Sequence, residues 1–262
     1  MGGYAEWFGT DLYRLLETAI VNGNLKPRSD GKFEFTGGYA WDTPWEYTNT
    51  DPANDCLFGE IIFEAVADRM APGSMGVPLS CQNCWKVVTR PKTLQQLFTI
   101  RDIQLELKHP SKVGIETRPS VYGLYGGYWY NHSLREGLER YRQVRGMIDT
   151  NLGPDVPLLL KRGCTEMEAK YGDSQKWRPG YGQKEIEQYI RNHIVFPPRS
   201  TTPPKENIPH IHRKWVEWAY QNGDETYKEY TDGRPLYTPY RTYHHLVNAR
   251  SDEIKEFMNA ED

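Results

Sequence analysis

The sequence predicts an α/β fold with a mostly parallel sheet flanked by helices. Three short apolar segments of strand length occur in the middle of the chain, at residues 85–89, 113–117 and 157–161. Each is followed by a basic residue, by a glycine or proline, and then by the start of a helical pattern. Strands that alternate with helices of this length are typical of β-α units. We expect an irregular, aromatic-rich loop region before this core and a helical, Pro/Tyr-rich extension after it.

The N-terminal part of the chain predicts two helices separated by a long loop. Residues 10–21 have apolar side chains at helical spacing. Residues 24–56 are rich in Gly, Pro, Asp and aromatic residues, which predicts an ordered loop with one short hairpin. Residues 57–70 again follow an amphipathic helical pattern. The expected buried face of the first helix consists of Leu12, Leu15, Leu16, Ala19 and Ile20.

Capping signals place a helix after each predicted strand. A Ser or Thr followed three residues later by Glu or Gln can satisfy two free backbone N–H groups at a helix start. Such pairs are Thr93 with Gln96, Ser133 with Glu136, and Thr165 with Glu168. Before the second of these helices, residues 122–132 are rich in Gly and Tyr and are expected to form a loop.

Beyond Gly172 the alternation of strands and helices weakens. Helical patterns cover residues 183–195, 208–222 and 251–259. The proline-rich residues 196–204 predict an extended linker or strap. We therefore expect two regions, with residues 1–178 forming the α/β core that carries the cysteine site. Residues 179–262 would form a helical and extended segment docked on that core.

Composition and charge limit the classes of function. The chain of 262 residues has 13% aromatic residues, so its core is expected to rely on large rings. A net charge of −3 argues against a general polyanion binder, so contact with nucleic acid would require a local basic patch. No segment approaches the roughly 20 apolar residues of a membrane span, and the N-terminus lacks the pattern of a secretory signal. We expect a soluble, cytoplasmic protein without membrane contact.

The strongest indication of a binding site is the set of four cysteines, Cys56, Cys81, Cys84 and Cys164. The Cys81/Cys84 pair has Cys-x-x-Cys spacing, which lets one turn of backbone aim two sulfurs at a single metal centre. The two isolated cysteines could complete four ligands. Because their long intervals differ from the compact zinc pattern, they favour an iron–sulfur cluster, with zinc as the alternative. The competing interpretation is a redox or chance pair and two buried thiols.

A parallel sheet would, however, keep these cysteines apart. Cys84 precedes the first predicted strand, whereas Cys164 follows the third. In a parallel sheet they lie at opposite ends, separated by roughly 17 Å for five residues at about 3.3 Å each. A shared centre therefore requires either that a predicted strand or its direction is wrong, or that the loop with Cys81 and Cys84 folds back. Otherwise the four cysteines do not form one site.

A second candidate site consists of Arg90, Arg118 and Arg162, each just after a predicted strand. In open α/β sheets ligands bind outside the carboxyl ends of the strands, where guanidinium groups could hold a phosphate, a carboxylate or a nucleic-acid backbone. The alternative is three unrelated surface arginines paired with acids. The rings that could stack on a base are Tyr125, Tyr128 and Trp129. Alternatively, these rings pack over the sheet.

The leading hypothesis is a cysteine-ligated metal protein, holding an iron–sulfur cluster or zinc, that binds and could process a phosphate-bearing ligand such as a nucleotide or nucleic acid. A centre saturated by four cysteines would be structural or electron-transferring, because Lewis-acid catalysis needs an open coordination position. The alternative is a non-enzymatic interaction or assembly protein. In that case the aromatic loops and the C-terminal segment would form the surface that binds a protein partner.

Overall fold

The computed structural model describes residues 6–7, 10–36, 44–49, 56, 58–59, 77–119, 121–196 and 204–236. The helix expected at 251–259, nearly all of the one at 57–70, and most of the linker at 196–204 lie outside these residues. Within the described part of the chain, no helix is long and apolar enough to cross a membrane.

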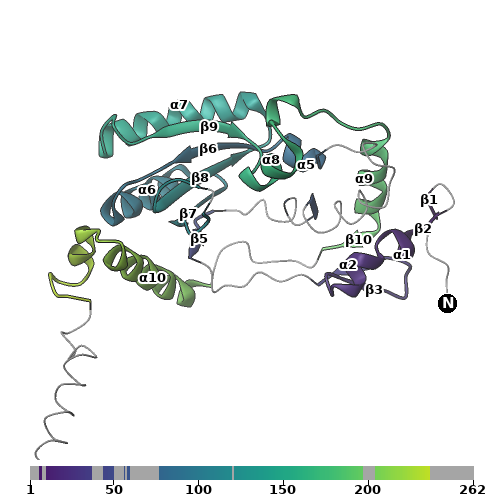
Figure 1. The fold of residues 1–262 in the computed structure, drawn as a ribbon, viewed down its shortest axis with the longest axis horizontal. Coiled ribbons are helices and arrows are strands. Elements are labelled where there is room, and N and C mark those ends of the chain that lie inside the picture. Colours follow the sequence, from purple (N-terminus) through teal and green to yellow (C-terminus); the bar gives the residue numbers. More distant parts are fainter. Residues whose placement is uncertain are drawn as a thin grey trace, which may run out of the picture.

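The main sheet is antiparallel. Its five strands lie in the order β5-β7-β8-β6-β9, and every neighbouring pair runs in opposite directions (Figure 1). The strands are β5 (Trp45–Tyr47), β6 (Trp85–Thr89), β7 (Ser111–Ile115), β8 (Tyr125–Asn131) and β9 (Leu158–Arg162). The prediction of a mostly parallel α/β sheet is therefore wrong, although the three predicted strands exist within two residues of their expected bounds.

The error comes from β8, which occupies the segment expected to be a loop. Two strand-helix-strand units are present, β6-α6-β7 and β8-α7-β9, as the capping signals indicated. In each unit, however, a strand of the other unit is inserted between the two strands. This is the split arrangement of a β-α-β-β-α-β chain. Because β8 and β9 run opposite to β6 and β7, the sheet is antiparallel throughout.

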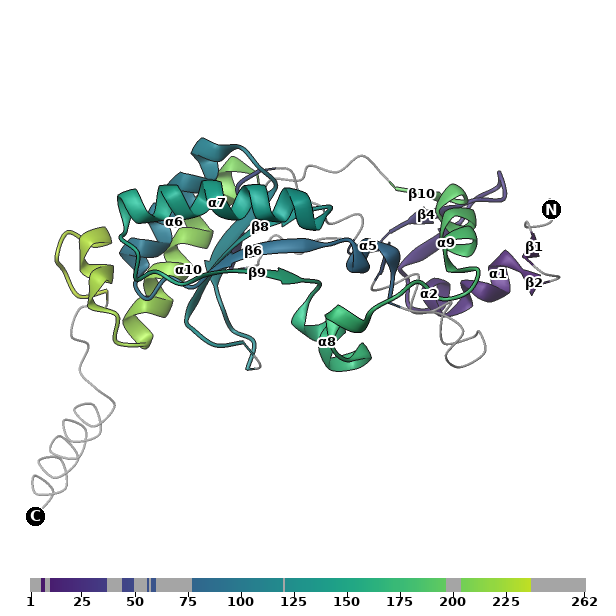
Figure 2. The same ribbon diagram turned by 90° about the horizontal axis from the view of Figure 1, so that it is seen from above.

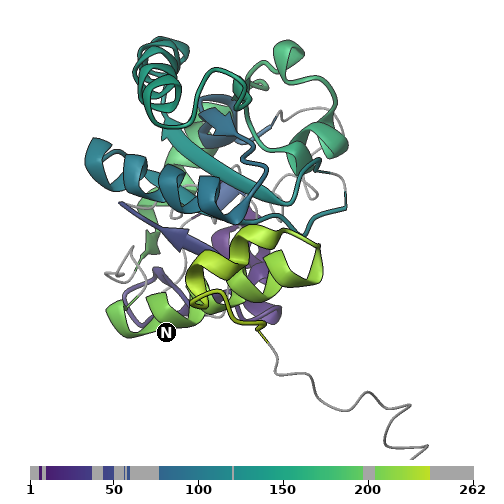
Figure 3. The same cartoon turned by 90° about the vertical axis from the view of Figure 1, so that its left-hand side faces the viewer.

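Three helices cover one face of the main sheet, which we call the helix face. They are α6 (Leu94–Leu107), α7 (Leu134–Asn151) and α10 (Ile208–Gln221). Their apolar residues join strand residues such as Val87 and Trp129 in the main core, and α6 and α7 lie next to each other in Figure 3. The predicted caps are confirmed for α6 and α7, where the Thr93 and Ser133 side chains accept hydrogen bonds from the backbone N–H three residues later.

A second, smaller core lies at one end of the molecule, beyond α5 (Leu79–Gln82) (Figures 1 and 2). It contains a three-stranded sheet in the order β10-β4-β3, in which only the β10/β4 pair is parallel. The elements are β3 (Leu25–Pro27), β4 (Phe33–Phe35), β10 (Ile194–Val195), α1 (Leu12–Leu15), α2 (Glu17–Val21) and α9 (Gln183–Asn192). The apolar face predicted for residues 10–21 packs here. Residues beyond 178 therefore contribute to both cores, since α9 joins this one and α10 the main one.

The other described elements are short. They are the antiparallel pair β1 (Glu6–Trp7) and β2 (Thr10–Asp11), the helix α8 (Thr165–Tyr171), and the 3-10 helices η2 (Ser174–Lys176), η3 (Lys205–Asn207) and η4 (Glu225–Tyr230). A helix is present where the third capping signal predicted one, because α8 begins at Thr165. Its N-cap residue is Cys164, however, and not Thr165, and the side chain of Cys164 makes no capping hydrogen bond.

Candidate functional site

The antiparallel pairing of β6 and β9 brings Cys84 and Cys164 to the same end of the sheet. Trp85, at the start of β6, pairs with Arg162, at the end of β9. The backbone N–H of Gly163 donates to the carbonyl oxygen of Cys84 at 2.8 Å. Parallel strands at about 3.3 Å per residue would separate Cys84 from Cys164 by roughly 17 Å. That separation does not arise, because β9 runs antiparallel to β6.

Gly163 is required where the chain passes from β9 to Cys164. Its φ of +66° lies in the left-handed region that side chains disfavour. A Cβ at this position would lie only 2.4 Å from the ring of Trp177, so a larger residue would also collide with that ring. The glycine therefore lets Trp177 cover this turn and sets the position of Cys164.

The Cys-x-x-Cys pair lies on and just after α5, which is held against α9. The backbone N–H of Leu79 donates to the carboxylate of Glu187 at 3.0 Å. The side chains of Gln82 and Gln183 both donate to the carbonyl oxygen of Val77, at 2.6 and 2.7 Å. These bonds attach the segment with Cys81 and Cys84 to α9, and thereby to the second core.

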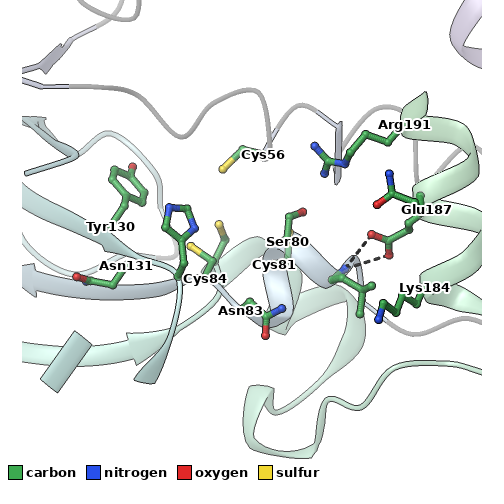
Figure 4. Close-up of a pocket in the computed structure, with 14 residues that line it drawn as sticks. Cys56, Ser80, Cys81, Asn83, Cys84, Tyr130, Asn131, Lys184, Glu187 and Arg191 are labelled. Atoms are coloured by element: carbon green, nitrogen blue, oxygen red, sulfur yellow. Dashed lines mark hydrogen bonds between the residues drawn. The ribbon is translucent and has the colours of Figure 1, made fainter. Parts of the chain in front are cut away.

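All four cysteines line one cavity of about 390 Å³, which we call the cysteine cavity. It lies between the end of the main sheet and α9, and the sulfurs of Cys56 and Cys84 face each other in it (Figure 4). Its other polar lining residues include Ser80, Asn83, Asn131, His132, Lys184, Glu187, Gln188 and Arg191. Burial raises the pKa of the Cys56 thiol well above its ordinary value, although Lys86 acts against this. The thiols are the residues that could hold a metal centre.

A buried lysine contacts this group of thiols. Lys86 is 7% exposed, and its Nζ donates to the Sγ of Cys164 at 2.7 Å. Burial by itself lowers the pKa of Lys86, but the nearby Cys164, Cys84 and Cys56 outweigh it and raise that pKa. The ammonium group therefore stays charged and can stabilise negative charge on the sulfurs.

Among the residues that the structure describes, no group of three or more His, Cys, Asp or Glu side chains is arranged so that it could hold a metal ion. The cavity bounded by the four cysteines has instead the volume of a small-ligand site, for which about 300–1,000 Å³ is typical.

A second cavity of about 460 Å³ lies against the face of the sheet opposite the helix face, and we call it the sheet cavity. Its lining includes Lys86, Arg90, Arg118, Tyr128, Lys161 and Cys164. Cys164 also lines the cysteine cavity, so the two cavities adjoin there. This second face was missed in the sequence. The alternation of Lys86 and Val88 with the core residue Val87 is the signal that could have identified it.

The structure brings two of the three predicted arginines together. Arg118 Nη2 lies 2.7 Å from Glu116 Oε2, and Arg90 Nη1 lies 3.5 Å from the same oxygen. Arg162 lies at the opposite end of the sheet, because β9 runs antiparallel to β6. Its guanidinium donates to the backbone carbonyls of Gln82 and Ser174, at 2.6 and 2.8 Å, so it holds the chain around the cysteines.

The predicted stacking residues divide between the two faces of β8. Tyr125 and Trp129 are fully buried on the helix face, where neither ring has a surface for a base. Tyr128 lies on the opposite face and lines the sheet cavity. Beside it, Lys112 Nζ lies 4.5 Å from the centre of the Trp45 ring, and burial together with Lys86 lowers its pKa to about 8.

The arrangement joins a cluster of thiols to a cavity lined by cations, with Lys86 between them. No protein-family model matches the chain, and neither a curated protein nor a solved structure is significantly similar to it.

Proposed function

We propose that the four cysteines hold an iron–sulfur cluster and that the protein binds a phosphate-bearing ligand, such as a nucleotide or nucleic acid, next to it. The observation that carries this proposal is that Cys56, the Cys81/Cys84 pair and Cys164, from three distant parts of the sequence, line one cavity. These four are all the cysteines of the chain. Four thiolates are the usual ligands of such a cluster.

The spacing of the cysteines supports a cluster over a single zinc ion. The long intervals that separate Cys56, the Cys81/Cys84 pair and Cys164 differ from the compact zinc pattern.

The charge around the cavity supports the same proposal. Thiolate-ligated clusters carry negative charge, and hydrogen bonds to their sulfurs stabilise them and tune their reduction potential. The bond from Lys86 to Cys164 supplies both a positive charge and a donor. Because four thiolates would saturate the cluster, its role would be electron transfer or structural support.

Anaerobic reconstitution with iron and sulfide tests this proposal. We expect stoichiometric iron and sulfide and a visible absorption band that bleaches on reduction. Cys164→Ala should bind iron at least about 100-fold more weakly, since even the loss of an outer partner weakens a metal site by about 10- to 100-fold. Asn151→Ala, a change at an exposed residue of α7 that does not line the cysteine cavity, is the control and should bind normally.

The other results of this experiment have defined meanings. Stoichiometric zinc without iron would replace the cluster by a structural zinc site. Absence of both metals from anaerobically prepared protein would overturn the proposal and leave the interaction protein as the alternative. For the phosphate-bearing ligand, the support is the set of cations that line the sheet cavity, namely Lys86, Arg90, Arg118 and Lys161.

A further inference from the structure

A second lysine of the sheet, Lys112 on β7, lies among aromatic rings on the face opposite the helix face. The register pairs Lys112 with Tyr47 of β5 on one side and with Tyr128 of β8 on the other, so these side chains share one face. Its Nζ lies 4.5 Å from the centre of the Trp45 ring, 5.4 Å from that of Tyr128 and 5.8 Å from that of Tyr47. We call this group the lysine cage. Because Tyr128 also lines the sheet cavity, the cage adjoins that cavity.

Two glycines make room for the rings of the cage. Gly114 and Gly126 pair across β7 and β8. A Cβ at Gly114 would lie 3.0 Å from the Trp45 ring, and a Cβ at Gly126 would lie 2.9 Å from the Tyr128 ring. A larger residue at either position would displace a ring, so these two glycines let both rings lie close to the strands beside the lysine.

Lys112 has no acid within ion-pair distance among the residues that the structure describes. The nearby acids pair with other cations, and these pairs are Arg90 with Glu116, Arg118 with Glu116, Arg118 with Glu166, and Lys161 with Glu168. The charge of Lys86 also acts on Glu166, and its Nζ donates to the Sγ of Cys164. Aromatic rings, and no described carboxylate, therefore contact the amine of Lys112.

This environment favours the neutral amine. Burial is the main cause, and the positive charges of Lys86 and Arg118 add to it, so the pKa of Lys112 falls to about 8. Cys164 and Cys56 act in the opposite direction. Because an ordinary lysine titrates near 10.4, the neutral form at about pH 7.5 is roughly 100-fold more abundant at Lys112. Burial and a neighbouring cation are the two features that activate lysines as nucleophiles.

We propose that Lys112 is a nucleophile that forms a Schiff base with a small aldehyde or 2-oxo acid. The lone pair of Nζ forms a bond to the carbonyl carbon, the C=O bond breaks, and its oxygen leaves as water with the two protons of the amine. The step needs no oxidant or reductant. Lys112 is half-buried, so a small compound can reach its side chain. The proposal does not depend on the cysteine centre.

The charges around the cage favour a carbonyl compound that carries an acid group. Such a group would offset the repulsion that Lys86 and Arg118 exert on Lys112. Glu116 and Glu166 already offset part of the Arg118 charge. We therefore expect a modest preference for an acidic over a neutral aldehyde, of about 2- to 5-fold.

Reductive trapping on the intact protein tests this proposal. Glyoxylate is the probe, cyanoborohydride converts the imine into a stable secondary amine, and peptide mass mapping locates the product. Lys108, which is exposed and four residues earlier, is the reference in the same chain. At about pH 7.5 we expect Lys112 to be labelled about tenfold faster than Lys108 or more, with burial offsetting part of the difference in neutral amine. The rate at Lys112 should level off above about pH 8, whereas that of an ordinary lysine rises toward about pH 10.

Variants identify the reacting group and its activation. Lys112→Arg keeps the positive charge but cannot form the imine, so the adduct at this position should disappear. Lys86→Met removes a repelling charge and should slow labelling of Lys112 by about 3- to 10-fold at about pH 7.5, where tenfold corresponds to one pKa unit. Lys161→Met is the matched control and should leave the rate unchanged, because Glu168 balances that charge.

Two results on the wild-type protein would overturn the nucleophile. They are labelling of Lys112 no faster than that of Lys108, and a rate at Lys112 that continues to rise well above pH 8. Equal labelling of Lys112 by glyoxylate and by neutral glycolaldehyde, each relative to Lys108, would overturn the preference for an acid group. Rapid trapping at Lys112 in a protein that takes up neither iron nor zinc would support this site while overturning the proposed function alone.

Discussion

The two faces of the main sheet are built from the same strands but differ in chemistry. On the helix face, β6 and β8 contribute Val87 and Trp129, which are fully buried under α6, α7 and α10. On the opposite face, their neighbours Lys86 and Tyr128 line the sheet cavity. Side chains alternate between the two faces of a strand, so one residue step separates a core position from a site position. The packed core that stabilises the protein therefore lies on the helix face, and the sheet cavity lies on the opposite face.

The largest expected effect is on the helix face. Trp129→Ala should destabilise the protein by about 3–5 kcal/mol, because it leaves a large cavity in the main core. The measurement is equilibrium unfolding in urea, with Tyr128→Phe as the adjacent control on the other face. If Trp129→Ala cost no more than that control, the division between the two faces would not hold.

Gly163→Ala tests whether the cysteine end of the sheet also depends on packing. The positive φ costs about 1–2 kcal/mol for a residue with a side chain, and the collision with Trp177 adds to this, so we expect at least about 2 kcal/mol. Iron uptake should fall as Cys164 shifts. In Gly153→Ala, the φ is also positive but no atom lies within 4 Å of the new Cβ. This control should lose only about 1–2 kcal/mol and should bind iron normally.

The third prediction concerns a buried carboxylate on the helix face. Glu46 accepts hydrogen bonds from Arg101 and His212, both at 2.7 Å. Burial alone would raise its pKa, but these bonds outweigh burial and lower the pKa below its ordinary value of 4.5. The resulting stability is therefore present above about pH 4.5 and is lost as the pH falls from there through the folded-state pKa.

Glu46→Gln should cost about 2–3 kcal/mol at neutral pH and should flatten the acid limb of the stability curve. Urea unfolding of the wild type and the variant between about pH 3 and pH 7 measures both effects. Parallel acid limbs in the two proteins would assign the loss of stability to other carboxylates.

The smallest expected change in stability is on the opposite face. The hydroxyl of Tyr128 donates to Glu116 at 3.0 Å and accepts from Arg90 at 2.8 Å and from Arg118 at 3.1 Å. These three charged groups also pair with one another, so each keeps a partner without the hydroxyl. Tyr128→Phe removes these bonds but keeps the ring, so we expect a loss of about 0.5–1.5 kcal/mol. Differential scanning calorimetry checks it. A loss as large as that in Trp129→Ala would contradict the difference in stability between the two faces.

Local structure was largely predictable from the sequence. Short apolar segments followed by a basic residue and a glycine or proline located β6, β7 and β9, and Thr93 and Ser133 marked the starts of α6 and α7. These signals depend on neighbours only a few residues apart, so they survive in any fold. The strand β8 was missed because its Gly126-Gly127 pair is typical of loops, whereas burial on both faces and pairing with two strands stabilise it here.

The sequence by itself determined which chemistry is present, namely four thiols, three arginines at strand ends and aromatic rings, together with most of the helices and strands. Only the tertiary structure decided which of these groups meet. Strand order and direction result from long-range pairing, in which the insertion of β8 reverses β9 relative to β6. That reversal places Cys164 beside Cys84 and Lys86, and it separates Arg162 from Arg90 and Arg118. No local pattern encodes this choice, because it depends on how whole strands bury their faces together.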